Sequence, residues 1–388
     1  MNIMASQNIQ RLEMGVFNEL LEAKRRLERG GMEMIDLSIG SPDTPPPDFV
    51  KEEIIRHASS DTNYGYTMGA IPTFNGKVAA FYEDRYGVPL NPRAEVLQLI
   101  GSQDGLAHLA TALVDPGDIV LVPDPGYPIF EVGVHIAGGE PWRMPLREEF
   151  GFLPRLDHIP KEIAERAKMM VLNYPANPVA ALADQAFLEE AVRFARQNDI
   201  LIVQDFTYSE LVFDGQRAVS LLSVPGAKEV AVEFNSFSKT FNIAGCRVGY
   251  MAGNAEVLRI MATMMSHTQY GIFYPIQKAA EAALTKGGDF IRKQVALYQS
   301  RRDALTDALT NAGWNTAKPA ATMYVWTRTP KGWLSSDFVF QLMEETGVVL
   351  TPGSAFGAEG EGFVRITLVQ PEEKLREAAA RIGGFLKT

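Results

Sequence analysis

Short apolar runs separated by helical stretches dominate the chain from about residue 50 to residue 280. Each run is four or five residues long and lacks the polar alternation of a strand with one face in water. Such runs are typical of strands buried on both faces of a parallel sheet, with helices as crossovers. The runs are 96–100, 119–122, 169–172, 200–203, 230–234 and 248–251. They predict an α/β domain with helices on both faces of its sheet.

Two stretches show the spacing of amphipathic helices. The first ends at Gly30 and Gly31, as a helix C-terminus would. The second follows Asp184, which can cap it. The apolar positions are Leu12, Val16, Phe17, Leu20, Leu21 and Leu27 in the first stretch and Phe187, Leu188, Ala191, Val192 and Ala195 in the second. Both stretches therefore predict helices with one face toward a core.

Beyond residue 285 the pattern changes to α+β. The predicted elements are a long charged helix at 289–311, a strand at 323–326, a helix at 336–345 and a strand at 364–368. This order suits a smaller second domain.

The length of the chain also predicts two domains, because 388 residues exceed what one core usually supports. A short strand at 35–40 runs into a proline-rich turn at 42–47, where we expect the chain to cross between domains. We therefore expect an N-terminal arm with part of the small domain at 1–47, a large domain at 48–284 and a small C-terminal domain at 285–388.

Charge and composition exclude several functions. The formal net charge of −10 gives no basic footprint for nucleic acid. The first ten residues lack the features of a signal peptide, and no stretch approaches the roughly 18 apolar residues of a membrane span, so we expect a cytoplasmic protein without a membrane partner. The single cysteine, Cys246, excludes an internal disulfide. The histidines lack the spacing of metal ligands, so no metal site is expected.

The first candidate site follows the run at 96–100. Gly101, Ser102 and Gln103 lead from that run into a helical stretch. A glycine turn at a helix N-terminus presents free backbone N–H groups and the positive end of the helix dipole, and both favour phosphate. No Gly-x-Gly-x-x-Gly or Walker sequence accompanies the turn, so a dinucleotide or a nucleoside triphosphate is not indicated. A purely structural turn is the alternative.

Two further runs end in polar side chains. The run at 169–172 leads into Asn-Tyr-Pro-Ala-Asn-Pro at 173–178, whose X-Pro steps stiffen the backbone and can fix an asparagine amide. The run at 200–203 leads to Asp205, and a carboxylate at the tip of a buried strand is costly without a cationic partner. A protonated pyridine nitrogen is such a partner. The alternatives are a rigid surface turn for the first and a turn-capping role for Asp205.

The segment Ser-Phe-Ser-Lys-Thr-Phe-Asn at 236–242 is the most informative one. The amine of Lys239 can form a Schiff base with an aldehyde once a dry pocket or a neighbouring cation lowers its pKa. The hydroxyls of Ser236 and Ser238 and the guanidinium of Arg247 suit a phosphate ester. A lysine that can form an imine, close to groups that can bind a phosphate, points to pyridoxal 5′-phosphate (PLP).

Together these segments resemble the class I/II, fold-type I PLP-dependent aminotransferases over essentially the whole chain. The most specific parts are 173–178, Asp205 with Tyr208, 236–239, Arg247, and 351–357 leading to 365–367. The resemblance implies an α/β fold in which a large domain, with a mostly parallel sheet flanked by helices, is joined to a smaller α+β domain. It also implies ping-pong transfer of an α-amino group between an amino acid and a 2-oxo acid.

The resemblance implies roles for individual residues. Lys239 would form the internal aldimine and move the proton between the substrate Cα and the cofactor C4′, while Asp205 would pair with the pyridine nitrogen. Asn177 and Tyr208 would hydrogen-bond the 3′ oxygen. The other implied contacts are Ser102, Gln103, Ser236 and Arg247 on the phosphate, Ser238 beside them, Tyr127 stacked on the ring, Gly40 on the substrate side and Arg365 on the α-carboxylate.

Tyr64 resembles the family tyrosine that reaches the phosphate from a partner subunit, which implies a homodimer with active sites at the subunit interface. The local spacing leaves open whether Tyr64 or Tyr66 has this role. The chain departs from the family pattern at Ala180, where a glycine is usual, and at Asn75, where an arginine is usual. Neither departure removes a catalytic group.

Two alternatives remain. The sequence around Lys239 also resembles that of C–S β-lyases that cleave cystathionine. An aminotransferase-like effector sensor of a transcription regulator is disfavoured, because the roughly 45 residues before the large domain carry no helix-turn-helix pattern. The amino donor stays open among alanine, aspartate, glutamate and LL-diaminopimelate.

Overall fold

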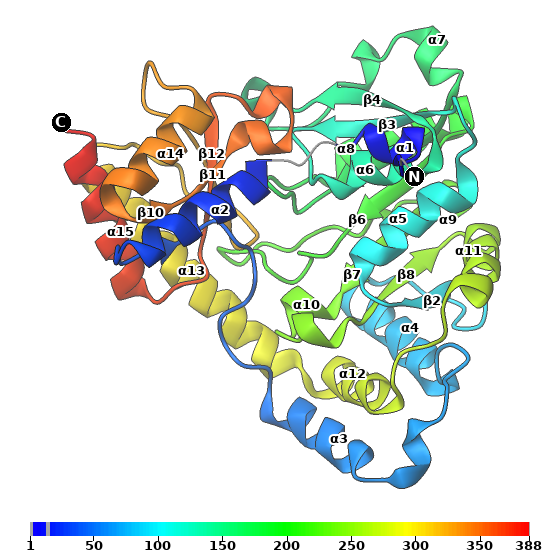
Figure 1. Ribbon diagram of the computed structural model, residues 1–388. Coiled ribbons are helices and arrows are strands. Elements are labelled where there is room, and N and C mark those ends of the chain that lie inside the picture. The colour runs from blue at the N-terminus through cyan, green and yellow to red at the C-terminus, as the bar shows by residue number, and fades with distance from the viewer. Residues whose placement is uncertain (1–2, 13–15, 388) are drawn as a thin grey trace.

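A seven-stranded sheet forms the centre of one half of the molecule (Figure 1) in the computed structural model, which describes residues 3–12 and 16–387. The strand order is β2-β8-β7-β6-β5-β3-β4, and adjacent strands are parallel except where β8 is involved. The strands are β2 (Val96–Leu99), β3 (Ile119–Asp124), β4 (Glu140–Pro145), β5 (Ala167–Asn173), β6 (Leu201–Asp205), β7 (Ala231–Ser236) and β8 (Gly249–Gly253). The predicted α/β class with a mostly parallel sheet is confirmed.

The direction of β8 corrects one prediction. The apolar run at 248–251 predicts a parallel strand, yet β8 is antiparallel to both β2 and β7. The connection from β7 to β8 holds only the short helix α10 (Phe237–Thr240) and a 3₁₀ turn at Ala244–Cys246. It is too short to cross to the opposite end of the sheet, so β8 starts where β7 ends and runs in the opposite direction. All residues of β8 are buried, and burial on both faces does not reveal a strand's direction.

Helices cover both faces of this sheet. Along β3, Ile119 and Leu121 enter one hydrophobic core, while Val120 and Val122 enter a second core on the opposite face. The first core is covered by α3 (Asp48–Ala58), α4 (Pro72–Tyr86), α8 (Gln185–Asn198) and α12 (Tyr274–Lys286), and the second by α5 (Ser102–Leu113), α6 (Ile129–Ala137) and α11 (Ala255–Thr268). The predicted cap of α8 is present, since the Phe187 N–H donates to the Asp184 carboxylate at 2.8 Å.

The other half of the molecule has its own core. Its helices are α2 (Val16–Arg29), α13 (Gly288–Asn311), α14 (Ser335–Thr346) and α15 (Glu372–Phe385). Its strands are β9 (Tyr324–Arg328), β11 (Thr351–Pro352) and β12 (Phe363–Thr367) in one sheet and the pair β1 (Ile35–Asp36) and β10 (Val348–Val349) in another. Helix α13 enters both halves, because Ile291 lies in the first core and Leu305 in this one. The domain boundaries at 47/48 and 284/285 remain our proposal.

Several elements differ from the prediction. β4 is not predicted, because it is an edge strand in which Met144 is the one buried residue. The strand expected at 35–40 is confined to β1. Helix α2 begins at Val16, and residues 13–15 of the predicted stretch lie outside the described residues. Short helices occur at α1 (Gln7–Gln10), α7 (Lys161–Ala164) and α9 (Ala227–Val230). Within residues 3–12 and 16–387, no helix combines the length and the apolar character needed to cross a membrane.

Candidate active site

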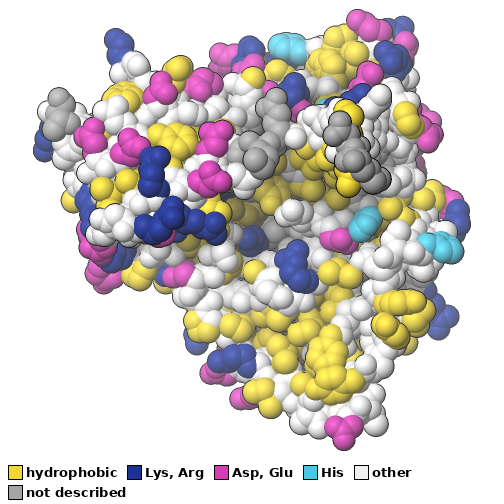
Figure 2. Space-filling model, in the orientation of Figure 1, with side chains coloured by type: hydrophobic (Ala, Val, Ile, Leu, Met, Phe, Trp, Pro, Cys, Tyr) yellow, Lys and Arg dark blue, Asp and Glu magenta, His cyan; other side chains and the backbone are white. Residues whose placement is uncertain are grey.

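The carboxyl ends of β2, β5, β6 and β7 meet at one edge of the sheet, because these strands point the same way. A cavity of about 310 Å³ lies there, and Figure 2 shows the corresponding hollow between the two halves. All predicted site residues except Tyr64 line this cavity, namely Gly40, Ser102, Gln103, Tyr127, Asn177, Asp205, Tyr208, Ser236, Ser238, Lys239, Arg247 and Arg365. The polar ends of distant runs therefore converge as expected.

Lys239 lies in α10, directly after β7. The Ser236 hydroxyl caps this helix by accepting from the Ser238 N–H at 3.2 Å. The Lys239 amine donates to the Gly40 carbonyl oxygen at 2.5 Å. Burial lowers the pKa of the Lys239 amine, and although Tyr324 and Asp205 raise it, Arg365 and Arg247 add to the lowering. The amine is thus more available in its neutral, nucleophilic form than an exposed lysine.

Asp205 is the last residue of β6 and is buried. Its carboxylate accepts from the Thr207 N–H at 3.1 Å, and its backbone carbonyl accepts from the Asn173 side chain at 2.9 Å. Burial raises the pKa of the Asp205 carboxyl, against the opposing effect of the Thr207 hydrogen bonds and of Lys239. Among residues 3–12 and 16–387, no cationic side chain forms an ion pair with Asp205. The site therefore contains a buried acid that a cationic ligand atom would stabilise.

The start of α5 forms a second part of the cavity. Gly101 has φ +85°, and a β-carbon there would lie 2.5 Å from a terminal nitrogen of Arg247. Arg247 is exposed at the rim, where it donates to the Ala244 carbonyl at 3.0 Å. The Thr207 hydroxyl donates to that of Ser102 at 3.4 Å. Hydroxyls, a guanidinium and the unsatisfied N–H groups of a helix N-terminus suit a phosphate.

Arg365 forms a third part of the cavity, from β12. Its guanidinium donates to the Asn177 side-chain oxygen at 2.9 Å and to the Ser38 carbonyl at 2.7 Å. Its Nε is buried and has no hydrogen-bond partner among the described residues. Asn177 is held in turn, because its N–H donates to the Asn173 side chain at 2.8 Å. A planar, partly unsatisfied guanidinium can bind a carboxylate with two parallel hydrogen bonds.

Tyr127 lines the cavity from the segment after β3. Its hydroxyl donates to the Gln103 side-chain oxygen at 2.9 Å, so it closes the cavity on the side of α5. Burial raises the pKa of the Tyr127 hydroxyl, which keeps it neutral.

Tyr64 is the predicted site residue that this chain does not bring to the cavity. It ends the 3₁₀ turn Asp61–Tyr64, the residue is 63% exposed, and its hydroxyl donates to the Ala58 carbonyl at 2.7 Å. Tyr66 is 82% exposed and lies against Tyr270. Neither ring lines the cavity.

Sequence reasoning missed several lining residues. These are Phe17, Ser38, Ile39, Leu106, Thr207, Ala244 and Tyr324. Thr207 lies two residues after Asp205, so its place at a strand end was a usable signal. Tyr324 belongs to a predicted strand, but nothing local indicates that this strand reaches the cavity. In the described part of the chain, no group of three or more His, Cys, Asp or Glu side chains is arranged to hold a metal ion.

Residues 32–382 match the family model described as aminotransferase class I and II. An LL-diaminopimelate aminotransferase of Moorella thermoacetica is 44% identical over 365 residues, which make up 94% of this chain and 93% of that relative. The solved structure of substrate-bound BacF from Bacillus subtilis is 36% identical, with a TM-score of 0.96 over 99% of this chain and 98% of its own. A probable N-succinyldiaminopimelate aminotransferase from Thermus thermophilus is 39% identical, with a TM-score of 0.91 over 95% of this chain and 99% of its own.

Proposed function

Since this chain belongs to the aminotransferase class I and II family and is an aminotransferase, we propose that its cavity binds PLP and that its amino donor is LL-diaminopimelate. The family uses this cofactor. The observation that carries the proposal is that the buried amine of Lys239 and the buried carboxyl of Asp205 line one cavity. The aminotransferase activity named for relatives up to 44% identical favours amino transfer over the C–S lyase and sensor alternatives.

The residues of the cavity fit PLP at two ends. The Asp205 carboxyl, which has no ion-pair partner among the described residues, would pair with the protonated ring nitrogen. The absence of a side chain at Gly101 lets the Arg247 guanidinium approach the N-terminus of α5, where guanidinium and backbone N–H groups would together hold the phosphate. Ser102, Gln103, Ser236 and Ser238 line the same side.

When bound, PLP supplies an aldehyde that condenses with amines and a ring that withdraws electrons from the Cα–H bond being broken. Lys239 attaches the cofactor and, once released by the substrate, moves the proton at the substrate Cα. The lowered pKa of its amine suits both tasks, because only the neutral amine is a nucleophile and a base. The Gly40 carbonyl orients this amine through its hydrogen bond.

Arg365 would hold the α-carboxylate of the substrate. A guanidinium has five N–H donors. That of Arg365 donates to Asn177 and Ser38, and its Nε has no partner within the described part of the chain. Asn177 would thus contact both Arg365, which binds the substrate carboxylate, and the 3′ oxygen of the cofactor. Tyr208 would also donate a hydrogen bond to this oxygen. Tyr127 would cover the ring.

LL-diaminopimelate is proposed from the relative that is 44% identical over 94% of this chain. This substrate carries a second ammonium and a second carboxylate at its far end. The charged side chains among the described lining residues are Asp205, Lys239, Arg247 and Arg365, and each already has a proposed partner. We therefore propose that the far end of the substrate is recognised at the rim, where a partner subunit completes the site.

A homodimer is supported by exposed aromatic and apolar side chains near the predicted phosphate-reaching tyrosine. Tyr64, Tyr66, Met68, Tyr270 and Phe273 are each at least 40% exposed. In Figure 2, hydrophobic side chains gather below the hollow, over the region where α3, α4 and α12 lie in Figure 1. Contiguous exposed apolar surface is typical of an interface. We propose that Tyr64 crosses this interface to the partner's phosphate site.

The amino donor is tested with single-turnover spectra. Holoenzyme is mixed with LL-diaminopimelate, aspartate, alanine, glutamate or phenylalanine, and the conversion of the bound cofactor is followed without a 2-oxo acid. We expect LL-diaminopimelate to convert the cofactor at the highest second-order rate, and 2-oxoglutarate or pyruvate to reverse the change. A faster reaction with any other donor would refute the substrate proposal but not the cofactor site.

A further inference from the structure

Tyr324 is the first residue of β9 and lines the cavity. It is buried, with 2% of its surface exposed. Its hydroxyl oxygen lies 2.7 Å from that of Tyr208, and the two rings meet edge to face with centroids 5.5 Å apart. At this distance one hydroxyl donates a hydrogen bond and the other accepts it.

Two other groups of the site adjoin Tyr324. The Arg365 guanidinium carbon lies 4.4 Å from the centre of the Tyr324 ring, which is a cation–π distance. A β-carbon on residue 40 would collide with the Tyr324 hydroxyl, so Gly40 is the residue that leaves room for it. The carbonyl of the same Gly40 accepts from the Lys239 amine. Tyr324 thus adjoins the proposed groups for the 3′ oxygen, the carboxylate and the imine.

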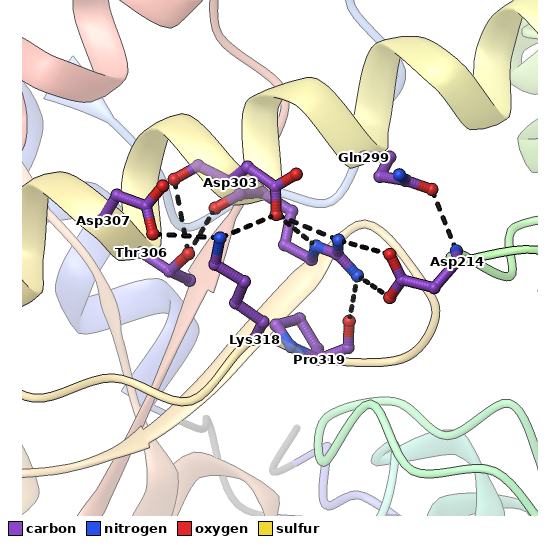
Figure 3. Close-up of polar contacts among 8 residues, drawn as sticks. Asp214, Gln299, Asp303, Thr306, Asp307, Lys318 and Pro319 are labelled. Atoms are coloured by element: carbon purple, nitrogen blue, oxygen red, sulfur yellow. Dashed lines mark hydrogen bonds and ion pairs between the residues drawn. The ribbon is translucent and has the colours of Figure 1, made fainter.

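The segments that carry Tyr208 and Tyr324 are fastened together. The Thr322 N–H donates to the Leu211 carbonyl at 2.7 Å, and the Phe213 N–H donates to the Ala320 carbonyl at 2.9 Å. Next to this pairing, Figure 3 shows Asp214 and the Pro319 carbonyl directed at one guanidinium. It belongs to Arg302, which donates to the two Asp214 oxygens at 2.6 and 2.9 Å and to Pro319 at 3.0 Å.

We propose that Tyr324 is a positioning residue for amino transfer, whose hydroxyl donates to Tyr208 and whose ring supports Arg365. The hydrogen bond from Tyr324 directs the Tyr208 proton toward the 3′ oxygen of the cofactor. Together with the Phe356 ring, whose centre lies 4.7 Å from the same guanidinium carbon, the Tyr324 ring fixes the plane of the Arg365 guanidinium, against which the substrate carboxylate binds. This inference rests on the proposed cofactor site.

The direction of the effect follows from charge. A hydrogen bond from Tyr208 to the 3′ oxygen stabilises its negative charge and weakens its hold on the neighbouring proton of the Lys239–cofactor bond. Tyr208 is a better donor while it accepts from Tyr324, because consecutive hydrogen bonds polarise one another. Without the Tyr324 hydroxyl, that proton is retained to higher pH. The visible absorbance band changes when the proton is lost, so the midpoint of this change also moves to higher pH.

The experiment is a pH titration of the visible band in holoenzyme. In Tyr324→Phe we expect the midpoint to rise by roughly half a pH unit, and in Tyr208→Phe by more. The double variant should match Tyr208→Phe alone, because Tyr324 acts through Tyr208. Tyr298→Phe is the matched control and should leave the midpoint unchanged. It removes a buried hydroxyl that has no hydrogen-bond partner among the described residues and does not line the cavity.

The role of the ring is measured separately with Tyr324→Leu. Relative to Tyr324→Phe, the KM for the amino donor and for the 2-oxo acid should rise roughly fivefold, with a smaller change in kcat, as expected for a lost cation–π contact. An unchanged midpoint in Tyr324→Phe, a further rise in the double variant, or an equal KM in the two Tyr324 variants overturns the inference. A wild-type protein that shows no visible band with PLP overturns the proposed cofactor site instead.

Discussion

Burial shifts the pKa values of Lys239 and Asp205 in opposite directions, and both shifts favour the neutral form. The pKa of the Lys239 amine is lowered and that of the Asp205 carboxyl is raised. A cofactor with a protonated ring nitrogen would give Asp205 the cation that the protein itself does not provide at ion-pair distance in the described residues. The charged form of Asp205 is then stabilised further in the loaded enzyme.

Asp205→Ala should therefore keep PLP bound while lowering kcat by at least about a hundredfold, because the ring loses its electron-withdrawing protonated form. Steady-state kinetics and the absorbance of the gel-filtered protein measure the two effects separately. A PLP analogue methylated on the ring nitrogen carries a fixed positive charge and should restore part of the lost rate. Wild-type kcat in Asp205→Ala would show that this carboxyl has no role in catalysis.

At the residue scale, strand ends made much of the site predictable. Asp205, Ser236 and Ser102 each follow or end a buried run, and the parallel strands bring them to one edge. Tyr324 was not predictable in this way, because its neighbours in space, Tyr208 and Arg365, are far from it in sequence. Arg365 reaches it through the pairing of β9 with β12, and Tyr208 reaches it because the segment after β6 packs into the second core. Tyr64 is the opposite case: the sequence indicates a role at the phosphate, but within one chain this residue does not line the cavity.

At the scale of elements, β7 carries a buried acid that the proposed reaction does not use. Glu233 accepts hydrogen bonds from the Leu221 N–H at 2.5 Å, the Ser220 hydroxyl at 2.8 Å and the Tyr82 hydroxyl at 3.1 Å. Burial nevertheless raises the pKa of Glu233 to about 7. The contacts fasten β7 to the segment at Leu221–Ser223 and to α4.

The raised pKa gives a signed prediction for stability. Between pH 4.5 and about 7 the folded chain retains a proton at Glu233 that the unfolded chain has lost, so this group's contribution to the free energy of unfolding falls as pH rises. The full effect is about 3 kcal/mol. Glu233→Gln mimics the protonated acid and does not titrate. Its free energy of unfolding minus that of wild type should therefore be larger at pH 8 than at pH 5, with both proteins measured by urea unfolding at each pH. A difference between the two proteins that does not change with pH would contradict the raised pKa.

The elements differ in how well the sequence determines them. The predicted helix at 289–311 matches α13 within a residue at each end, and α8 begins directly after its predicted cap, because a cap and a 3.6-residue apolar period act locally. β4 lacks such a signal, since an edge strand pairs through its backbone and buries little of its side-chain surface. The direction of β8 depends on the path of its connection, which hydrophobicity does not encode.

On the scale of the whole molecule, the cavity lies between two halves with separate cores. Tyr208 belongs to the second core although its segment follows β6 of the first half, and α13 contributes to both. Tyr208 therefore connects the two halves at the cavity that it lines. The second join that we propose is the homodimer interface, through which Tyr64 would enter the partner's site.

Mixed dimers test this shared site. Lys239→Ala and Tyr64→Ala should each be strongly impaired alone. Subunits unfolded together and refolded as a mixture should recover about a quarter of wild-type activity, because half of the dimers are mixed and each of these has one intact site. Mixing without unfolding is the control. Activity that never exceeds the sum of the separate variants would contradict a site shared between subunits.

Reductive trapping shows whether the Lys239 amine carries the cofactor. Protein loaded with PLP is treated with borohydride, which fixes the carbon–nitrogen bond, and is then digested for peptide mass spectrometry. We expect one phosphopyridoxyl group per chain, on Lys239, and none on that peptide in Lys239→Ala. A label on a different lysine, or no label on wild-type protein that has been saturated with PLP, would contradict it.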